Sequence, residues 1–396
     1  MPKISHRGME MPSSPIRKLA PLANAAKKQG VKVYHLNIGQ PDLPTPQQGL
    51  DALKHIERKT LEYSPSEGYP ALREKLVGYY KKFDIAVSPE EIIVTCGGSE
   101  AILLGLLSCL DPEDEIIMVE PGYANYISFA KTANIKAKTV TSHIEDGFAL
   151  PPLDAFEKAI TPRTKAILLC NPSNPTGYVY TPQDLQQIKE IVLKHDLFLF
   201  SDEVYREFVY NGKPYLSALS LGIPEHVVLI DSVSKRYSEC GTRIGMLVTH
   251  NKMVHDTVMK YCQARLSPPL LGQIVAEASI EGSEDYAKAC FDEYKARRDF
   301  FIKGLNEIPG VYTPTPEGAF YTVASLPVED AEDFCRWLLT DFRLNGETVM
   351  MAPAAGFYST PGLGRNQVRM AYVLKKEDLA RAIDVLKAAL EAYNKR

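Results

Sequence analysis

The chain has 396 residues, of which 45% are hydrophobic and 24% are charged, and its formal net charge is −4. This composition is typical of a globular protein with room for two domains, and no basic block suited to nucleic acid or an anionic membrane is present. The apolar runs are too short to span a bilayer, and residues 1–14 lack the apolar core of a signal peptide.

Seven cysteines are scattered along the chain, and none of them forms a CxxC pair. An odd, unpatterned set of cysteines favours reduced thiols over a disulfide framework or a zinc site. We therefore expect a cytoplasmic protein without a bound metal.

The N-terminal residues are expected to form an arm. A short helix is predicted from Ser14 to Ala26 and a strand over 33–38, which the segment GQPD at 39–42 ends. Apolar spacing then predicts helices over 47–60 and 70–83, with a loop at 63–68 between them.

From residue 91 onward, apolar strands alternate with amphipathic helices. The expected strands span 91–95, 115–119, 137–140, 165–170, 197–201, 227–231 and 245–249, and the expected helices lie near 99–110, 123–132, 152–159 and 182–195. This alternation predicts an α/β fold with a mainly parallel seven-stranded sheet that helices cover on both faces.

The last third of the chain has a different pattern. A long charged helix is expected over 282–306, followed by strands at 320–324 and 367–373 and helices at 329–343 and 376–394. These elements indicate a smaller α+β unit. We expect a large domain at 45–285 and a small domain built from 1–44 and 286–396.

A glycine pair lies between an expected strand and the helix that follows it, in the segment TCGGSE at 95–100. Gly98 and Ser99 there would allow close backbone approach, and the helix N-terminus would offer free N–H groups to a phosphate. Plain turn geometry is the alternative explanation for such a pair.

Two later loops also follow apolar strands. Tyr123, in PGYANY at 121–126, can stack on a planar ring, although a lone aromatic is also common in a core. Asn174 lies in NPSNPTG at 171–177, where two X-Pro bonds restrict the backbone and can aim the amide at a ligand. A rigid surface turn is the alternative for this loop.

Asp202 ends the expected strand at 197–201, and Tyr205 follows shortly after it. A carboxylate at the end of a core strand is costly to desolvate unless it is paired. Asp202 can hold a pyridine nitrogen protonated, and Tyr205 can donate to the phenolic oxygen of the same ring. The alternative role for Asp202 is to cap the following helix.

Lys235 leaves the sheet after the expected strand at 227–231, where α/β proteins build their sites. Ser232, Ser234 and Arg243 lie near it in the sequence. An amine for a Schiff base, hydroxyls and a guanidinium form the set that holds an aldehyde cofactor carrying a phosphate. The alternative is an exposed lysine in a polar loop.

Arg369 lies among apolar neighbours in the strand-like segment QVRMAY at 367–372. An arginine in such a place suits bidentate capture of a carboxylate, and a surface charge on an edge strand is the alternative.

Together these motifs resemble the class I and II, fold-type I aminotransferases that use pyridoxal 5′-phosphate, the aspartate aminotransferase superfamily. The resemblance extends from NIGQPD at 37–42 to Arg369, and it depends on the order NPxNPTG, DEVY, SxSK and GxRIG. It implies the fold-type I architecture and pyridoxal phosphate as the cofactor.

The resemblance also implies a role for each matching residue. Lys235 would form the Schiff base and move the proton, and Asp202 would pair with the pyridinium nitrogen. Asn174 and Tyr205 would contact the phenolic oxygen, and Tyr123 would stack on the ring. The expected phosphate contacts are Gly98, Ser99, Ser232, Ser234 and Arg243. Arg369 would hold the substrate α-carboxylate with help from the backbone at Gly39 and from Asn174, and Tyr63 would reach the phosphate of a neighbouring subunit, which implies a homodimer with shared sites.

The substrate is less closely defined by these motifs. In one aspartate-specific bacterial subgroup a lysine helps to recognise the side-chain carboxylate, and Ser99 stands in that place here. Arg17, on the N-terminal arm, is the candidate cation that replaces it. We expect amino transfer from aspartate to 2-oxoglutarate, with neutral or aromatic donors as the alternative.

Two other functions are compatible with the same motifs. A β-lyase or a cyclopropane-forming lyase would keep the cofactor and change the reaction. A regulator that binds pyridoxal phosphate without turnover would need a DNA-binding extension or a basic surface block, and the sequence shows neither of these.

Overall fold

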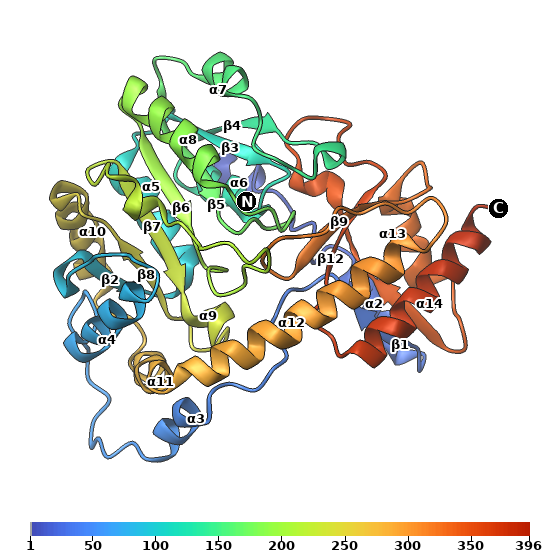
Figure 1. The fold of residues 1–396 in the computed structure, drawn as a ribbon, viewed down its shortest axis with the longest axis horizontal. Coiled ribbons are helices and arrows are strands. Elements are labelled where there is room, and N and C mark those ends of the chain that lie inside the picture. The colour runs from blue at the N-terminus through green and yellow to red at the C-terminus, as the bar shows by residue number, and fades with distance from the viewer. Residues whose placement is uncertain (1) are drawn as a thin grey trace.

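Residues 2–396 are described by a computed structural model. Its larger part is organised around a seven-stranded sheet (Figure 1). In spatial order the strands are β2 (Ile92–Thr95), β8 (Gly245–Val248), β7 (Val227–Ser232), β6 (Phe198–Asp202), β5 (Thr164–Cys170), β3 (Glu115–Glu120) and β4 (Lys136–Thr141). From β7 to β4 all neighbours are parallel, and β8 is antiparallel to both β7 and β2. The predicted mainly parallel seven-stranded sheet is confirmed.

Helices cover both faces of this sheet because its central strands are apolar on both sides. Successive residues of β7 show this, since Leu229 and Ile230 belong to two different hydrophobic clusters. The Ile230 side holds α5 (Gly97–Cys109), α6 (Asn125–Thr132) and α10 (Lys252–Arg265). The Leu229 side holds α4 (Pro70–Lys81), α7 (Leu153–Ala159), α8 (Pro182–His195) and α11 (Leu270–Ile280).

A smaller part joins the two ends of the chain. One antiparallel sheet has the strand order β11 (Ala352–Pro353), β12 (Gln367–Ala371) and β9 (Tyr321–Ser325). The parallel pair β1 (Lys32–His35) and β10 (Glu347–Met350) forms another, with Lys32 opposite Glu347. The helices of this part are α2 (Ala20–Lys28), α13 (Ala331–Thr340) and α14 (Lys376–Tyr393).

The long helix α12 (Ser283–Asn306) runs from α11 across the molecule to the small sheets (Figure 1). This path and the β1–β10 pairing are consistent with the expected division at residues 44/45 and 285/286, which stays a prediction. The one-turn helices are η1 (Pro89–Glu91), η2 (Ile144–Asp146), η3 (Ala218–Leu221) and η4 (Ala354–Phe357).

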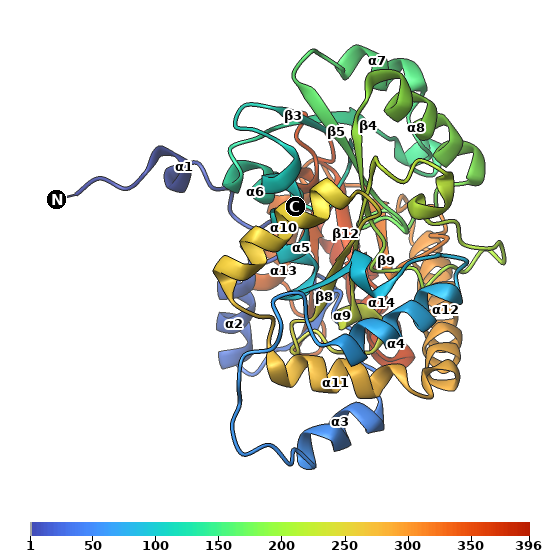
Figure 2. The same cartoon turned by 90° about the vertical axis from the view of Figure 1, so that its left-hand side faces the viewer.

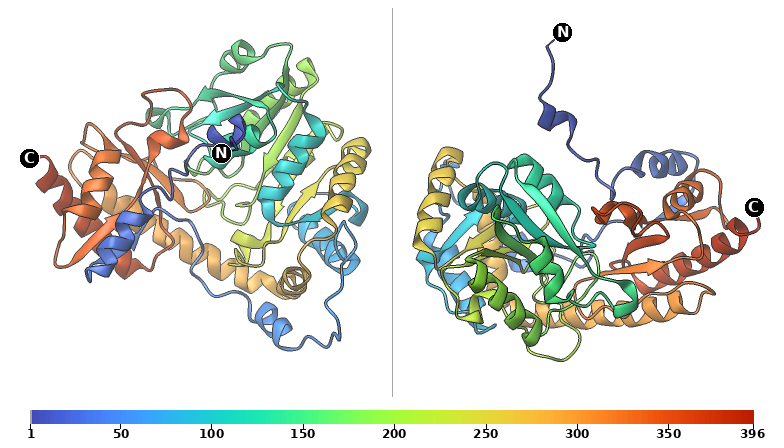
Figure 3. Two further views of the ribbon diagram at one scale, coloured as in Figure 1. Left: turned by 180° about the vertical axis from the view of Figure 1, so that it is seen from behind. Right: turned by 90° about the horizontal axis from the view of Figure 1, so that it is seen from above.

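Two short helices lie at the periphery. α1 (His6–Met9) buries none of its residues and projects away from the body of the molecule (Figures 2 and 3). α3 (Gln47–Lys54) packs on α11 at the edge of the larger part (Figure 2). Its neighbouring loop, residues 55–63, is almost entirely exposed.

Several predicted boundaries are wrong for physical reasons. The helix predicted over 47–60 ends at Lys54, because residues 55–60 have no apolar face to bury and an isolated turn is not stable. The helix predicted from Ser14 begins at Ala20 instead, which places Pro21 in the first turn, where its missing N–H is tolerated. The strand predicted over 33–38 ends at His35, and the helices α10 and α11 and the strands β10 and β11 were not predicted.

Candidate active site

A cavity of about 700 Å³ opens at the carboxyl ends of the parallel strands. Its wall includes the last residues of three neighbouring strands, Cys170 of β5, Asp202 of β6 and Ser232 of β7. This edge is where open α/β sheets place their ligands. The sequence-predicted site residues that line the cavity are Arg17, Gly39, Gly98, Ser99, Tyr123, Asn174, Asp202, Tyr205, Ser232, Ser234, Lys235, Arg243 and Arg369.

Lys235 enters the cavity from the one-turn helix α9 (Val233–Arg236). The hydroxyl of Ser232 caps this turn by accepting the N–H of Ser234 at 3.1 Å. The Lys235 Nζ donates to the carbonyl of Gly39 at 3.1 Å. A Cβ at Gly39 would lie 2.1 Å from the hydroxyl oxygen of Tyr321, so only glycine fits there. The amine is therefore held at the junction of the two parts of the molecule.

Asp202 is buried, and it accepts a hydrogen bond of 2.6 Å from the hydroxyl of Tyr126 and a longer one from the N–H of Val204. None of the ion pairs of residues 2–396 involves it. Burial raises the pKa of its carboxyl group to about 6. A buried carboxylate without a cation is a strong site for a positively charged ligand atom.

Phenol and amide groups form another part of the cavity lining. The hydroxyls of Tyr205 and Tyr321 lie 3.0 Å apart. Burial raises the pKa of Tyr205 well above its usual value and that of Tyr123 to about 12, so both phenols stay neutral donors. The Asn174 Oδ1 accepts from the Nη1 of Arg369 at 3.2 Å.

A further part of the lining presents donors suited to a phosphate. Gly98 and Ser99 lie in the first turn of α5, whose thirteen residues give it free N–H groups and a dipole. Gly97 has φ 75°, and a Cβ there would lie 2.4 Å from the Nη2 of Arg243. Glycine at this point therefore lets the guanidinium approach the helix N-terminus, and the hydroxyls of Ser232 and Ser234 line the same cavity.

Arg369 projects from β12, and only 1% of it is exposed. Its guanidinium carbon lies 4.6 Å from the ring centre of Tyr321 and 5.0 Å from that of Phe357. The guanidinium also donates to the carbonyl of Asn37, while its Nε has no hydrogen-bond partner in the described chain. Burial lowers the pKa of Arg369, and none of the ion pairs among residues 2–396 involves it. A carboxylate ligand would complete the site.

Arg17 and Tyr63 differ in position. Arg17 lines the cavity and is exposed, and the side chain of Asn37 holds its segment by donating to the carbonyl of Ile16 at 2.9 Å. Tyr63 lies outside the cavity of its own chain and is 75% exposed.

The sequence analysis did not predict Tyr126, Cys240 and Tyr321 as residues that line the cavity. Tyr126 belongs to the motif that supplied Tyr123, but no spacing rule marked it as a partner of Asp202.

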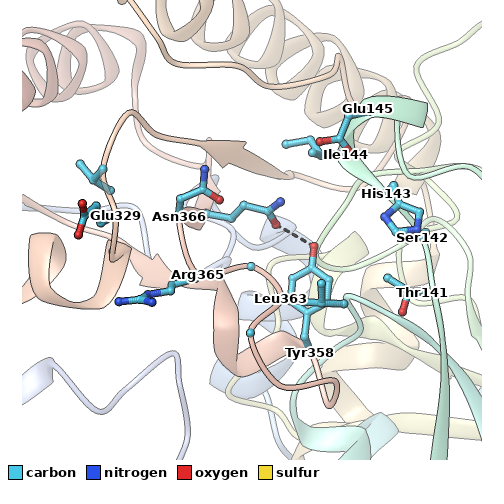
Figure 4. Close-up of a pocket in the computed structure, with 14 residues that line it drawn as sticks. Thr141, Ser142, His143, Ile144, Glu145, Glu329, Tyr358, Leu363, Arg365 and Asn366 are labelled. Carbon is cyan, nitrogen blue, oxygen red and sulfur yellow. Dashed lines mark hydrogen bonds between the residues drawn. The ribbon is translucent and has the colours of Figure 1, made fainter.

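A second cavity of about 470 Å³ lies between residues 141–145 and the segments 328–329 and 358–367 (Figure 4). Tyr358 donates to the Oε1 of Gln367 across one side of it at 2.7 Å, and His143 and Glu145 line another side. None of the sequence-predicted site residues lines this cavity. The candidate active site is therefore the larger cavity.

Comparison with known proteins agrees with the geometry of the site. Residues 31–386 match the family described as aminotransferase class I and II. An aspartate aminotransferase of Pyrococcus horikoshii is 30% identical over 400 residues, which cover 98% of this chain and 97% of the relative. The structure of the Thermus thermophilus aspartate aminotransferase with maleate has a TM-score of 0.88 at 28% identity, and covers 98% of this chain and all of that one. An alanine aminotransferase from Pyrococcus furiosus has a TM-score of 0.90 at 30% identity, with the same coverage.

Proposed function

The chain belongs to the class I and II aminotransferases, and from this premise we propose that it transfers the amino group of L-aspartate to 2-oxoglutarate. The enzyme is a transaminase that uses pyridoxal phosphate, as members of this family do. The observation that supports the acidic substrate is the guanidinium of Arg17, which lines the cavity and takes part in no ion pair among residues 2–396.

The residues of the cavity fit pyridoxal phosphate. The unpaired carboxylate of Asp202 suits the protonated ring nitrogen, and Tyr205 with Asn174 suits the phenolic oxygen. Tyr123 would pack on the ring. The phosphate would bind Gly98, Ser99, Ser232, Ser234 and Arg243. When bound, the cofactor supplies an aldehyde carbon for the amino group and a ring that withdraws electrons.

The chain's own residues then orient the substrate and move its proton. Arg369 binds the α-carboxylate through its two-pronged guanidinium, which fixes the direction of the Cα–H bond. Lys235, which lines the same cavity, would act as general base and take the proton from the substrate Cα. Asp202 and Arg369 are both buried, so bulk solvent would have little access to either charge.

The second carboxylate of aspartate or 2-oxoglutarate needs a further cation, because an unpaired charge in a closed site is strongly unfavourable. The cations that line the cavity in the described chain are Arg17, Lys235, Arg243 and Arg369. The last three are assigned to the aldehyde carbon, the phosphate and the α-carboxylate. Arg17 therefore remains for the side-chain carboxylate.

The first prediction concerns Arg17→Gln, which removes the charge and keeps most of the length. We expect kcat/KM for aspartate and 2-oxoglutarate to fall roughly 30- to 5000-fold, which corresponds to a rise of about 2–5 kcal/mol in activation free energy, because the side-chain carboxylate of the substrate loses its cationic partner. With alanine or phenylalanine as the donor, kcat/KM should change by less than about threefold. Steady-state kinetics with each donor measures this.

Lys18→Gln is the matched control for Arg17. It removes the same charge from the adjacent residue, which forms an ion pair with Glu332 instead of lining the cavity. It should leave the ratio of aspartate to alanine turnover unchanged. If the wild-type enzyme uses neutral donors far better than aspartate and Arg17→Gln alters nothing, the acidic substrate is wrong. Neutral or aromatic donors, the alternative favoured by Ser99 in place of a lysine, would then be the substrate class.

We also infer a homodimer with shared sites. Tyr63 is joined on its surface by exposed apolar residues from the same loop and from the chain around residue 270. These are Leu61 (65% exposed), Leu266 (49%) and Leu271 (43%). Ser66 of this loop donates to the carbonyl of Leu266 at 2.6 Å, so both segments form one surface. A second copy of the chain would cover this apolar surface and bring Tyr63 to the phosphate end of its cavity.

Subunit exchange tests the shared site. Protein carrying Tyr63→Ala and protein carrying Lys235→Ala should each be weakly active or inactive. After mixing and exchange, hybrid dimers contain one site with both residues intact, so activity should return to about a quarter of the wild-type value per subunit. A fully active monomer, or no recovery after proven exchange, would rule out the shared site.

The compartment is a further proposal. All seven cysteines are free thiols. Among residues 2–396, no helix combines the length and the apolar character that crossing a membrane requires. Free thiols in this number are typical of a reducing compartment, and we propose the cytoplasm.

A further inference from the structure

Four charged side chains lie buried behind the cavity and form a connected chain. Glu203 and Asp231 are 0% exposed, and Arg206 and Arg236 are 2% exposed. The Nη2 of Arg206 lies 2.9 Å from the Oε2 of Glu203, and its Nη1 lies 3.1 Å from the Oδ2 of Asp231. Arg236 contacts the same Oδ2 through its Nη2. The charges alternate in sign along the chain and sum to zero.

Each member of this charge chain is the sequence neighbour of a residue that lines the cavity. Glu203 follows Asp202, and Arg206 follows Tyr205. Asp231 precedes Ser232, and Arg236 follows Lys235. The backbone segments that carry the site are thus the same segments that carry the charge chain.

The charge chain lies on the opposite side of the sheet edge from the cavity. Asp231 and Ser232 are successive residues of β7, so their side chains point to opposite faces. Ser232 lines the cavity, whereas the Oδ2 of Asp231 accepts from the hydroxyl of Tyr80 on α4 at 2.9 Å. Also on α4, the ring centre of Tyr79 lies 3.8 Å from the guanidinium carbon of Arg236. Helix α4 therefore supports the charge chain from behind.

Stability alone does not account for such an arrangement. Each buried ion loses several kcal/mol of solvation, and well-packed apolar side chains of similar volume are often at least as stable. What the charge chain adds is directional geometry, because the planar guanidinium of Arg206 meets Glu203 through its Nη2 and Asp231 through its Nη1, which fixes its orientation between them. Burial acts to raise the pKa of Asp231, but the charges of Arg236 and Arg206 outweigh this and hold it below its usual value, so the carboxylate stays ionised.

Arg236 is the end of the charge chain nearest to the lysine. Its Nη1 has no hydrogen-bond partner among the described residues, and the same is true of both carboxylate oxygens of Glu239. Burial raises the pKa of Glu239 to about 7. The titratable and charged groups that surround Arg236 are Asp231, Arg206, Tyr79, Tyr237 and Glu239.

We propose that the chain Glu203–Arg206–Asp231–Arg236 is a positioning device for amino transfer, which holds the Lys235 helix and the strand end at Asp202 at a fixed separation without contacting substrate or cofactor. This inference depends on the roles proposed above for Lys235 and Asp202. Arg236 acts through Asp231, which it shares with Arg206. Loss of its guanidinium releases one end of α9 and also removes a positive charge from the back of the site.

The test uses the holoenzyme with Arg236→Met, which removes the charge, and Arg236→Lys, which keeps the charge but not the fork. In Arg236→Met we expect kcat to fall by about 10- to 100-fold, as misplacement by a fraction of an ångström does, with KM for the amino acid within about threefold. The pKa of the nitrogen that joins Lys235 to the cofactor, read from the absorbance as a function of pH, should rise by about half a unit to one unit because a nearby positive charge is lost.

Arg236→Lys separates geometry from charge. It should keep the absorbance pKa within about 0.3 units of wild type and still lose about tenfold in kcat, because the ammonium of lysine lacks the planar group that contacts Asp231 through its Nη2 and packs on the Tyr79 ring. If Arg236→Met does not fold, the kcat of Arg236→Lys still tests the positioning role. Arg298→Met is the control, since Arg298 is a buried arginine of α12 that pairs with Asp299 and lies outside the cavity lining. It should lower the melting temperature and leave kcat and the absorbance titration unchanged.

The outcomes separate this inference from the proposed function. Normal kcat and a normal titration in both Arg236 variants, with only a loss of thermal stability like that of Arg298→Met, would show that the charge chain is purely structural and would overturn the inference alone. If the cofactor absorbance and its pH dependence were the same in the wild-type enzyme and in Lys235→Ala, the proposed site would be overturned as well. A fall in kcat with unchanged KM and the expected shift in Arg236→Met supports the positioning role.

Discussion

Replacing Lys235 with alanine should reduce transamination by about 10⁴-fold or more, because the substitution removes both the covalent anchor of the cofactor and the general base. The amine enters the cavity from α9 and contacts Gly39 at 3.1 Å, and no other lysine lines that cavity among the described residues. The bound cofactor should remain, since Asp202 and the phosphate donors are untouched. Cofactor content and turnover of the purified variant measure the two effects separately.

Borohydride reduction provides the control for this prediction. In the wild-type enzyme, reduction should fix the cofactor to the peptide that contains Lys235, which peptide mapping identifies. In Lys235→Ala the same treatment should leave no cofactor covalently attached, so all of it should be released when the protein is denatured. Mapping to a different lysine, or a variant with ordinary turnover, would contradict the assignment.

Asp202→Asn should lower kcat by about 10²–10³-fold, because the neutral amide no longer favours the protonated ring nitrogen. The same change should stabilise the cofactor-free protein at alkaline pH. The carboxyl group of Asp202 has a pKa of about 6 in the folded protein, above the ordinary value of 3.8 for aspartate. The folded state thus binds more protons between these values, and stability falls as pH rises from about 4 to 6.

The stability effect has a definite window. At pH 8 the aspartate is ionised in both states and its burial penalty is complete, so Asp202→Asn should gain about 2–3 kcal/mol there and little at pH 4. Asp292→Asn is the control, because this aspartate is exposed on α12 and pairs only with Lys288, so its loss should matter by less than about 0.5 kcal/mol. Urea unfolding at both pH values measures the difference. Equal stabilisation at pH 4 and pH 8 would show that the charge of Asp202 is not the cause.

The sequence predicted the central sheet because its signal is local. Each buried strand of the sheet is a short apolar run, and the motifs with Asp202 and Lys235 come directly after two such runs. Parallel strands place their carboxyl ends at one edge of the sheet. Assigning the strands was therefore enough to predict that Asp202 and Lys235 lie close together. The ends of α2 and α3 could not be predicted with the same accuracy, because tertiary burial and the position of Pro21 decide them.

Residues that reach the site from distant parts of the chain were harder to predict. Tyr321 begins β9, and only the packing of that strand brings its hydroxyl to within 3.0 Å of Tyr205 and its ring under Arg369. The sequence also contained no explanation for Arg236. Its partner Asp231 lies only five positions earlier, but the pairing depends on the one-turn helix that follows β7 and on α4 behind it.

Transfer of ¹⁵N from labelled aspartate to unlabelled 2-oxoglutarate tests the central claim most directly. The purified enzyme should produce ¹⁵N-glutamate and oxaloacetate in equal amounts, with no labelled ammonium. Lys235→Ala should produce neither. Release of the label as ammonium would indicate a lyase in place of a transaminase, and label that stays in aspartate under conditions where alanine or phenylalanine reacts would contradict the acidic substrate.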